Sequence, residues 1–486
     1  MADIDLAAVG VVVIFGFGVG NHVRAMSDRM KRTGLIVVFE PDVALLRAVF
    51  ERIDCSAWMR DSNVVVLTDE HETGEIAAVT KGFEAALACG MKLLDHPPSR
   101  SLLGARAGVF AERFTHVVKA VRTAVVTTLV HVDVSVRNVL QNVDHYVTWP
   151  GLNDLAGVAK GRSAIVVSAG PSLQRNLHLL EDKVVRERFV IIATQTMLKP
   201  LLAKGIKPHF VTALDYHEIS RRFYEGLTPA DVEGVTLVVE PKANPAILEA
   251  FPGAIRCVAD RVLDEILGEG LYEERTELQA GATVAHLAYY LARHLGADPV
   301  IMIGQDLGFT DHCYYGPGAA IHRVWGPELG AFRTIEMLEW ERIARMKGLL
   351  RRIDDHAGQP MFTDEQMATY LVQFERDFLA DTQRGLTVID ATEGGCAKRH
   401  AKTMPLAEAI GAFRGAGQIH LPRSVRKPDA KPRIAKARAR LQELSAGSVE
   451  MERLSRETAE LLTEVRHHHE DQSRVNRLIS KVHANA

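Results

Sequence analysis

The chain has few cysteines and no excess of basic residues. Five cysteines are scattered over 486 residues without a C-x-x-C pair: Cys55, Cys89, Cys257, Cys313 and Cys396. This usage suits a reducing compartment and provides no zinc motif. Acidic residues slightly outnumber basic ones, and the formal net charge is -3. A dedicated nucleic-acid-binding protein is usually basic, so nucleic acid is not an expected partner.

Signatures of several enzyme classes are missing as well. The sequence contains no G-x-x-x-x-G-K-[ST] P-loop and no G-x-S-x-G nucleophile elbow. No D-x-D pair follows a predicted strand, which is where many sugar-nucleotide enzymes hold a metal. We therefore do not expect P-loop NTPase chemistry, and we predict a reaction that needs no metal and no cofactor.

One N-terminal stretch, residues 4–20, is almost entirely apolar. It lacks a basic n-region and a small-residue cleavage site, and glycines interrupt it, so it does not resemble a signal peptide. Its length is marginal for a membrane span. We predict a buried strand that leads into a glycine loop, no membrane span, and a cytoplasmic protein.

A chain of 486 residues predicts two to three domains. Short apolar strands alternate with helices, which indicates an α/β fold with parallel sheets covered on both faces. We predict a Rossmann-like N-terminal domain at residues 1–100 and a helical connector at 101–150. A central parallel-sheet α/β domain is predicted at 151–410, with a helical insert at about 331–380. A helical C-terminal domain is predicted at 411–486, where Leu454, Leu461 and Leu462 indicate an amphipathic helical pair.

The N-terminal domain carries a glycine-rich loop. The apolar run at residues 11–15 predicts a strand, Gly16-Phe17-Gly18-Val19-Gly20 follows it, and a helix is predicted over residues 21–32. Further strands are predicted at 35–39, which ends in Glu40, and at 64–67. This order is typical of nucleotide-binding folds, and also of domains that keep the glycine turn for packing alone.

A second small-residue loop follows the predicted strand at residues 164–168. Gly170 and Pro171 break the strand, and Ser172 is predicted to cap a helix over residues 173–180. Free N–H groups at a helix start favour anionic oxygen. The loop is therefore either a site for a phosphate-bearing ligand or a tight βα turn without one.

Strands of the central domain are predicted at 164–168, 189–193, 209–214, 235–240, 255–258, 300–303 and 386–390, and helices at 173–180, 197–203, 244–251 and 283–294. Polar residues follow most of these strands. Ligands of open parallel sheets bind beyond the carboxyl ends of the strands, so these residues should converge on one edge. They offer donors for a phosphate and a ribose, and groups for proton transfer. A second glycine turn, with Gly281 and Thr283 before a helix, adds another anion site, and His286 in that helix is expected to pack in the core. The predicted edge residues are Ser168, Gly170, Ser172, Thr194, Gln195, Asp215, Gln305, Asp306, Thr310, His312, Tyr314, Thr392 and Glu393.

Eight segments of the central domain share their order and spacing with one known family. They are Ala164-Ile-Val-Val-Ser-Ala-Gly-Pro-Ser-Leu173, Lys199-Pro-Leu-Leu202, Gly205-Ile-Lys-Pro208, Leu214-Asp215, Gly281-Ala-Thr-Val-Ala-His286, Leu295-Gly-Ala-Asp-Pro299, Gly304-Gln-Asp-Leu307 and Ala391-Thr-Glu-Gly-Gly395. Over about residues 150–410 the chain thereby resembles the motility-associated factor (Maf) glycosyltransferases of flagellated bacteria. The glycine loop with Glu40-Pro41-Asp42 is similar to that family's first domain.

This resemblance implies transfer of a nonulosonic acid, of the pseudaminic, legionaminic or sialic type, from its CMP-activated donor. The acceptor would be a Ser or Thr hydroxyl of flagellin, modified in the cytoplasm. By similarity to bacterial CMP-sialic-acid transferases, Gly170, Pro171 and Ser172 would hold the CMP phosphate. Thr194 and Gln195 would contact the cytidine or the ribose.

The resemblance leaves the base that deprotonates the acceptor open among Asp306, Asp215 and His312, with a carboxylate favoured. Related sialyltransferases use a histidine, and here His312 and Tyr314 lie shortly after the Gln-Asp-Leu segment. Two positions depart from the family pattern. Thr283 stands where a serine is usual, which keeps the hydroxyl, and Tyr216 follows Asp215 in place of a small residue or proline.

Two other functions fit the sequence. Archaeal 6-hydroxymethyl-dihydropterin pyrophosphokinases share the Gly-Pro-Ser-Leu loop, but they are much shorter and would need ATP with a metal. A flagellin-binding assembly factor without catalytic activity is the third possibility, because fold does not fix function. The additional first domain and the helical tail favour the transferase.

Overall fold

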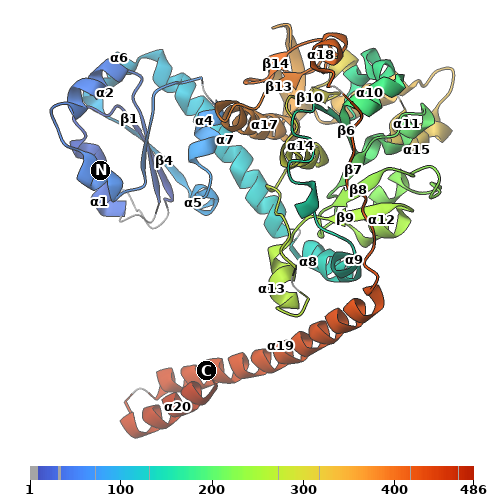
Figure 1. The fold of residues 1–486 in the computed structure, drawn as a ribbon. Coiled ribbons are helices and arrows are strands. Elements are labelled where there is room, and N and C mark those ends of the chain that lie inside the picture. Colours follow the sequence, from blue (N-terminus) through green and yellow to red (C-terminus); the bar gives the residue numbers. More distant parts are fainter. Residues whose placement is uncertain are drawn as a thin grey trace.

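The computed structural model describes residues 9–30, 34–71, 73–130, 132–271, 273–316, 318–415, 417–468 and 470–485. Two parallel sheets, one of four strands and one of eight, are joined by a long helix, and a helical hairpin projects from the main body (Figure 1). The α/β fold class predicted from the sequence is confirmed. The predicted apolar segment at 4–20 begins outside the described residues, as do the last two residues of the helix predicted over 21–32. Every described helix is too short or too polar to cross a membrane.

The N-terminal sheet has the strand order β3-β2-β1-β4, and all its pairs are parallel. Strands β1 (Val11–Phe15), β2 (Leu35–Phe39) and β3 (Val64–Leu67) have the predicted bounds. Strand β4 (Met91–Asp95) was not predicted, because polar residues interrupt its apolar pattern. The surrounding helices are α1 (Asn21–Met30), α2 (Val43–Phe50), α3 (Ser56–Arg60), α4 (Thr73–Val79), α5 (Glu84–Cys89) and α6 (Pro97–Leu103).

Helix α7 (Ala105–Val130) links the two sheets (Figure 1). Its first half belongs to the core of the N-terminal sheet, where the rings of Phe110 and Phe39 stack with centroids 4.3 Å apart. Helices α8 (Val132–Gln141) and α9 (Val143–Thr148) then lead to the central sheet. A second contact between the two parts is made by α4, which packs against α17 (Glu365–Gln383).

The central sheet has the order β14-β13-β10-β5-β6-β7-β8-β9, and every pair is parallel. Its strands are short apolar runs, most of them buried on both faces, which explains why the sequence predicted all but β14 to within two residues. They are β5 (Ala164–Val167), β6 (Val190–Thr194), β7 (Phe210–Ala213), β8 (Thr236–Val239), β9 (Ala254–Cys257), β10 (Val300–Ile303), β13 (Val388–Asp390) and β14 (Lys402–Thr403).

The strand order reverses direction between β5 and β10. From β5 the chain adds β6 to β9 on one side, and it then returns to add β10, β13 and β14 on the other. Such a reversal marks the usual ligand position in open α/β sheets, which is a crevice at the carboxyl edge of the strands.

Helices cover both faces of this sheet. The predicted helices at 197–203, 244–251 and 283–294 are confirmed as α11 (Leu198–Ala203), α12 (Pro245–Ala250) and α14 (Val284–His294). The helix predicted over 173–180 is wrong. Two 3-10 segments replace it, η3 (Pro171–Arg175) and η4 (Leu177–Glu181), and the Ser172 side chain does not cap either. The remaining elements are η2 (Asn153–Leu155), α10 (Lys183–Arg188), η5 (Gln195–Met197), η6 (Glu218–Phe223), α13 (Arg261–Leu267), η7 (Thr310–His312) and α18 (Leu406–Phe413).

The insert between β10 and β13 is only partly helical. Helices α15 (Ala320–Trp325), α16 (Ile335–Arg345) and α17 are joined by short segments η8 (Gly326–Glu328) and η9 (Lys347–Leu349) and by an antiparallel hairpin. The hairpin strands β11 (Leu350–Asp354) and β12 (Pro360–Asp364) were not predicted. Their residues are half polar and mostly exposed, so they lack the apolar runs that marked the other strands.

The tail forms the predicted helical pair. Helix α19 (Ala430–His467) and the shorter α20 (Gln472–Asn485) pack against each other beyond the rest of the molecule (Figure 1). The base of α19 is anchored to the central domain by Arg433, which lies 2.7 Å from Glu273. Leu454 and Leu461 are half-buried, but Leu462 is 48% exposed and does not share in the predicted apolar face.

Candidate functional site

A cavity of about 580 Å³ occupies the crevice at the carboxyl edge of the central sheet. Its walls come from the loops after β5, β6, β7 and β10, from the start of α14 and from the insert. Ten of the residues predicted from the sequence line it. They are Ser168, Gly170, Pro171, Thr194, Gln195, Asp215, Thr283, Gln305, Asp306 and Tyr314.

The other predicted residues are not among those that line this cavity. Thr310 and the exposed His312 line a separate cavity of about 530 Å³. Thr392 is fully buried, and the Glu393 carboxylate accepts hydrogen bonds from Asn176 (3.0 Å) and from the Leu406 N–H (2.9 Å). Ser172 is also fully buried, and Gly281 lies beside the lining residue Ala282.

Ser172 and Asp306 lock the loop after β5 to the loop after β10. The Ser172 N–H donates to Asp306 Oδ1 (3.1 Å), and Ser172 Oγ donates to Asp306 Oδ2 (2.7 Å). Gly170 makes this contact possible, because a Cβ at that position would lie 1.8 Å from Asp306 Oδ2. Its φ of -69° suits any residue, so glycine is required here for space.

The carboxylate of Asp306 is held in a nearly dry environment. Its residue is 2% exposed, and this burial raises its pKa, opposed by the hydrogen bonds from Ser172 and by the charge of Lys398. Since Asp306 accepts the hydrogen bonds of Ser172, the geometry gives it a positioning role. It has little freedom to approach an acceptor hydroxyl.

The N–H groups of the loop after β5 are largely used inside the protein. Ser168 donates to Ile303, Gly170 to Gly304 (2.7 Å), Ser172 to Asp306 and Leu173 to Gly170. The sequence-based expectation that this helix start presents free N–H groups is therefore wrong. The loop forms a tight wall of the cavity.

The start of α14 has unpaired N–H groups, which the loop after β5 largely lacks. Thr283 is the N-cap residue, and its Oγ1 accepts the N–H of His286 (3.3 Å). The N–H groups of Val284 and Ala285 meet no acceptor among the described residues, and both residues line the cavity. Unpaired N–H groups in the first turn of a helix bind anionic oxygen. The sequence predicted a second anion site at this position, and both residues with unpaired N–H groups border the cavity.

Asp215 is the one other carboxylate that lines the cavity. It follows β7, and its Oδ1 accepts the N–H of His217 (3.1 Å) while its Oδ2 accepts the hydroxyl of Ser220. The side chain is half-buried. In contrast to Asp306 it stands on a loop at the open edge of the sheet, so it is better placed to accept a proton from a bound substrate.

Part of the cavity wall is aromatic and cationic, and of its residues the sequence predicted only Tyr314 as a site residue. Four tyrosines and two arginines line it: Tyr216, Tyr314, Tyr315, Tyr370, Arg222 and Arg342. Burial raises the pKa of Tyr314 and of Tyr315, so both phenols remain neutral at physiological pH. Such a wall combines flat apolar faces with hydroxyl and guanidinium donors.

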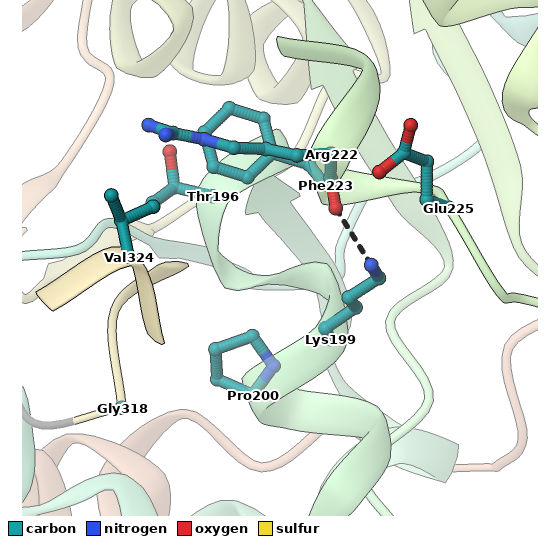
Figure 2. Close-up of a pocket in the computed structure, with 8 residues that line it drawn as sticks. All are labelled: Thr196, Lys199, Pro200, Arg222, Phe223, Glu225, Gly318 and Val324. Carbon is teal, nitrogen blue, oxygen red and sulfur yellow. Dashed lines mark hydrogen bonds between the residues drawn. The ribbon is translucent and has the colours of Figure 1, made fainter. Parts of the chain in front are cut away.

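A smaller cavity of about 270 Å³ adjoins this wall (Figure 2). Its lining includes Thr196, Lys199 and Arg222. Lys199 Nζ donates to the backbone carbonyl of Arg222 at 2.6 Å, which fixes the backbone from which the Arg222 side chain extends.

Side chains of the N-terminal domain occupy the space around its glycine loop. Glu40 accepts the N–H of Phe17 (3.0 Å) and of Asp42 (3.2 Å). A Cβ at Gly16 would lie 2.3 Å from Ser99, and one at Gly18 would lie 2.6 Å from His96. These contacts favour the packing interpretation of the loop over nucleotide binding.

In the part of the chain that the structure describes, no three His, Cys, Asp or Glu side chains gather in a group that could hold a metal ion.

Comparisons with known proteins give two matches. A family model described as 6-hydroxymethylpterin diphosphokinase MptE-like matches residues 137–312. A search of the curated proteins finds no match. Among the solved structures, one titled "Structure of MAf glycosyltransferase from Magnetospirillum magneticum AMB-1" is 15% identical, with a TM-score of 0.47, and the match covers 98% of this chain and 69% of that chain. The matched family model includes the Gly-Pro-Ser-Leu loop that the sequence shares with the pterin pyrophosphokinases.

Proposed function

We propose that the protein is a Maf-type glycosyltransferase that moves a nonulosonic acid from its CMP-activated donor to a Ser or Thr hydroxyl of flagellin. The observation that carries the proposal is the single cavity at the strand-order reversal. It joins the free N–H groups of α14, an open carboxylate and an aromatic wall. The eight sequence segments shared with the family supply nearly half of its lining residues.

The cavity suits each part of this reaction. The acceptor oxygen attacks the anomeric carbon, the bond from that carbon to the phosphate oxygen breaks, and CMP leaves with the bonding electrons. Asp215 takes the proton of the acceptor hydroxyl. The N–H groups of Val284 and Ala285 face the departing phosphate and stabilise its growing charge, so the proposed reaction needs no metal.

Gly170 and Pro171 form the wall behind the phosphate, and Ser168 orients Gln305 through a hydrogen bond from its Oγ to Oε1 (2.7 Å). Thr194 and Gln195, from the end of β6, are proposed to face the ribose or the cytidine. We propose that the reaction takes place in the cytoplasm, before flagellin is exported.

The match to the diphosphokinase model favours a second candidate, a pyrophosphokinase that uses ATP. The two functions differ in their nucleotide. Thermal unfolding in the presence of CMP or of ATP with Mg²⁺ separates them, and we expect CMP to raise the melting temperature. Stabilisation by ATP with Mg²⁺, and none by CMP, would favour the kinase.

The transferase itself is tested by the intact mass of flagellin. We expect flagellin from a deletion strain to lose the mass of one or more nonulosonic acids, and purified protein with a CMP-nonulosonic acid to restore it. An unchanged flagellin mass in the deletion strain would contradict the proposal and would favour a non-catalytic assembly factor.

A further inference from the structure

Two arginines that line the cavity of about 580 Å³ donate no hydrogen bond and form no ion pair among the described residues. Arg222 comes from η6, which follows β7, and Arg342 comes from α16 of the insert. They reach the same cavity from parts of the fold that are far apart in sequence. Both side chains are half-buried. A guanidinium offers five N–H donors, so together these two bring ten unused donors to one wall.

Arg342 is held in place by aromatic rings. Its guanidinium lies over the Tyr314 ring, 4.7 Å from the centroid, and over the Tyr315 ring at 5.4 Å. Stacking of this kind fixes the plane of a guanidinium and leaves its edge free to donate. The position is therefore prepared for a planar acceptor.

Arg222 is prepared in a similar way. Its guanidinium lies over the Phe223 ring (5.3 Å), and its Nε is buried without an acceptor. It points away from the carboxylate of Glu225 (Figure 2), whose ion-pair partner is Arg221 at 3.2 Å. The positive charges of Arg342 and of Arg222 both oppose the rise of the Tyr315 pKa, so both guanidinium groups lie near this one phenol.

Among the described residues that line the cavity, neither carboxylate forms an ion pair with Arg222 or Arg342. The two acidic residues are Asp215 and Asp306, and each already accepts two hydrogen bonds from neighbouring residues. A partly buried donor without an acceptor costs free energy, and the cost is larger for a charged group. An anionic group on a ligand would accept these hydrogen bonds and remove this free-energy cost.

We propose that Arg222 and Arg342 bind a carboxylate on the sugar of the donor, at a subsite separate from the phosphate at the start of α14. A carboxylate presents two oxygens in one plane, which matches the fork of a guanidinium. The neighbouring tyrosines provide flat faces for the sugar ring. This inference rests on the proposed function, because it assigns the carboxylate of a nonulosonic acid to these two side chains.

The experiment is calorimetric titration of the full chain with three probes: CMP, CDP, and CMP-N-acetylneuraminic acid. The variants are Arg222→Gln and Arg342→Gln, with Arg222→Lys and Arg342→Lys as conservative forms. Arg221→Gln is the matched control, because Arg221 is adjacent in sequence, exposed, and paired outside the cavity. Circular dichroism and thermal unfolding establish that each variant is folded.

We expect the wild type to bind the CMP-sugar more tightly than CMP. Each Gln variant should weaken binding of the CMP-sugar by about 10- to 100-fold and leave CMP unchanged. The Lys variants should lose less affinity for the CMP-sugar, because they keep the positive charge but not the forked donors of a guanidinium. Arg221→Gln should bind the CMP-sugar like the wild type.

Three results would overturn the inference. If the Gln variants bind the CMP-sugar as the wild type does, the carboxylate lies elsewhere, and the proposed function stands. If the Gln variants lose affinity for CDP to the same extent as for the CMP-sugar, the arginines recognise a second phosphate. If the wild type binds neither CMP nor the CMP-sugar, the proposed function fails and this subsite fails with it.

Discussion

The hydroxyl of Ser172 points at Asp306, 2.7 Å away, and is closed off from the cavity that its loop borders. The two residues are 134 positions apart in sequence. Ser172 was predicted to hold the donor phosphate, and the structure gives it a partner inside the protein. The serine therefore ties its own loop to the loop after β10.

Ser172→Ala should therefore reduce stability more than ligand binding. The variant removes one hydrogen bond to a buried carboxylate, which is worth about 1.5–3 kcal/mol of unfolding free energy. We expect CMP affinity to change less than threefold, which is roughly 0.6 kcal/mol. Urea unfolding and calorimetry measure the two quantities. Ser448→Ala, on the exposed side of α19, is the control. Loss of CMP binding with unchanged stability would instead support the predicted direct contact between Ser172 and the donor phosphate.

Gly170→Ala should damage both stability and binding. The added methyl group would overlap Asp306 Oδ2, so the carboxylate and the loop after β10 must move. We expect a loss of roughly 1–3 kcal/mol of unfolding free energy, as for other overpacked sites, and weaker binding of CMP. Gly411→Ala is the matched control. Its position in α18 has no neighbouring atom within 4 Å, and alanine should stabilise that helix by about 0.5–1 kcal/mol. Equal behaviour of the two variants would contradict the packing argument.

Asp215→Asn should separate catalysis from binding. The amide keeps an acceptor for the His217 N–H but cannot take a proton from the acceptor hydroxyl. We expect the turnover number for glycosyl transfer to fall by about 10²- to 10⁴-fold, with little change in CMP affinity. The control is Asp231→Asn, in an exposed turn beside Thr228. A variant that retains full turnover would exclude Asp215 as the base.

His286 should contribute to acid sensitivity. Burial lowers its pKa to about 3 from the usual 6.5, with a smaller lowering from Arg376 and an opposing effect of Asp377. Between pH 6.5 and 3 the unfolded chain binds a proton at this position and the folded chain does not. The unfolding free energy therefore falls as the pH drops through this window, with a slope of up to about 1.4 kcal/mol per pH unit from this one group.

His286→Phe tests this. The new ring can keep the stacking on Phe374, whose centroid lies 3.7 Å from that of His286, and it carries no titrating group. Urea unfolding at a series of pH values should give a shallower slope between pH 3 and 6.5. His483→Gln, at an exposed position of α20, should leave the slope unchanged. A slope equal to that of the wild type would show that His286 does not titrate as described.

The sequence predicted those elements whose signal is local. Apolar runs such as residues 11–15 and 300–303 became strands with the predicted bounds, and Thr283 caps α14 as its position before the helix suggested. His286 is fully buried, as predicted. Strands β4, β11, β12 and β14 are short or half polar and carry no such signal.

Features that depend on distant partners could not be predicted in this way. The role of Ser172 is decided by Asp306, which belongs to another strand of the sheet. Arg222 and Arg342 occur in ordinary polar segments 120 positions apart, and only the folded chain brings them to one cavity. Thr310 and His312 follow the correct strand, but a turn with positive φ at Asp311 and His312 directs the chain to another cavity.

The reversal of strand order between β5 and β10 divides the assembly of the cavity into an early and a late half. A partly folded chain that has paired only β5 to β9 possesses the loop at residues 168–172 but not the aspartate that fixes it. Contacts between such distant positions form slowly. Any ligand that bridges the two loops therefore recognises only molecules that have completed the eight-stranded sheet. Its binding free energy stabilises the native state and leaves the early intermediates, which cannot bind it, unaffected.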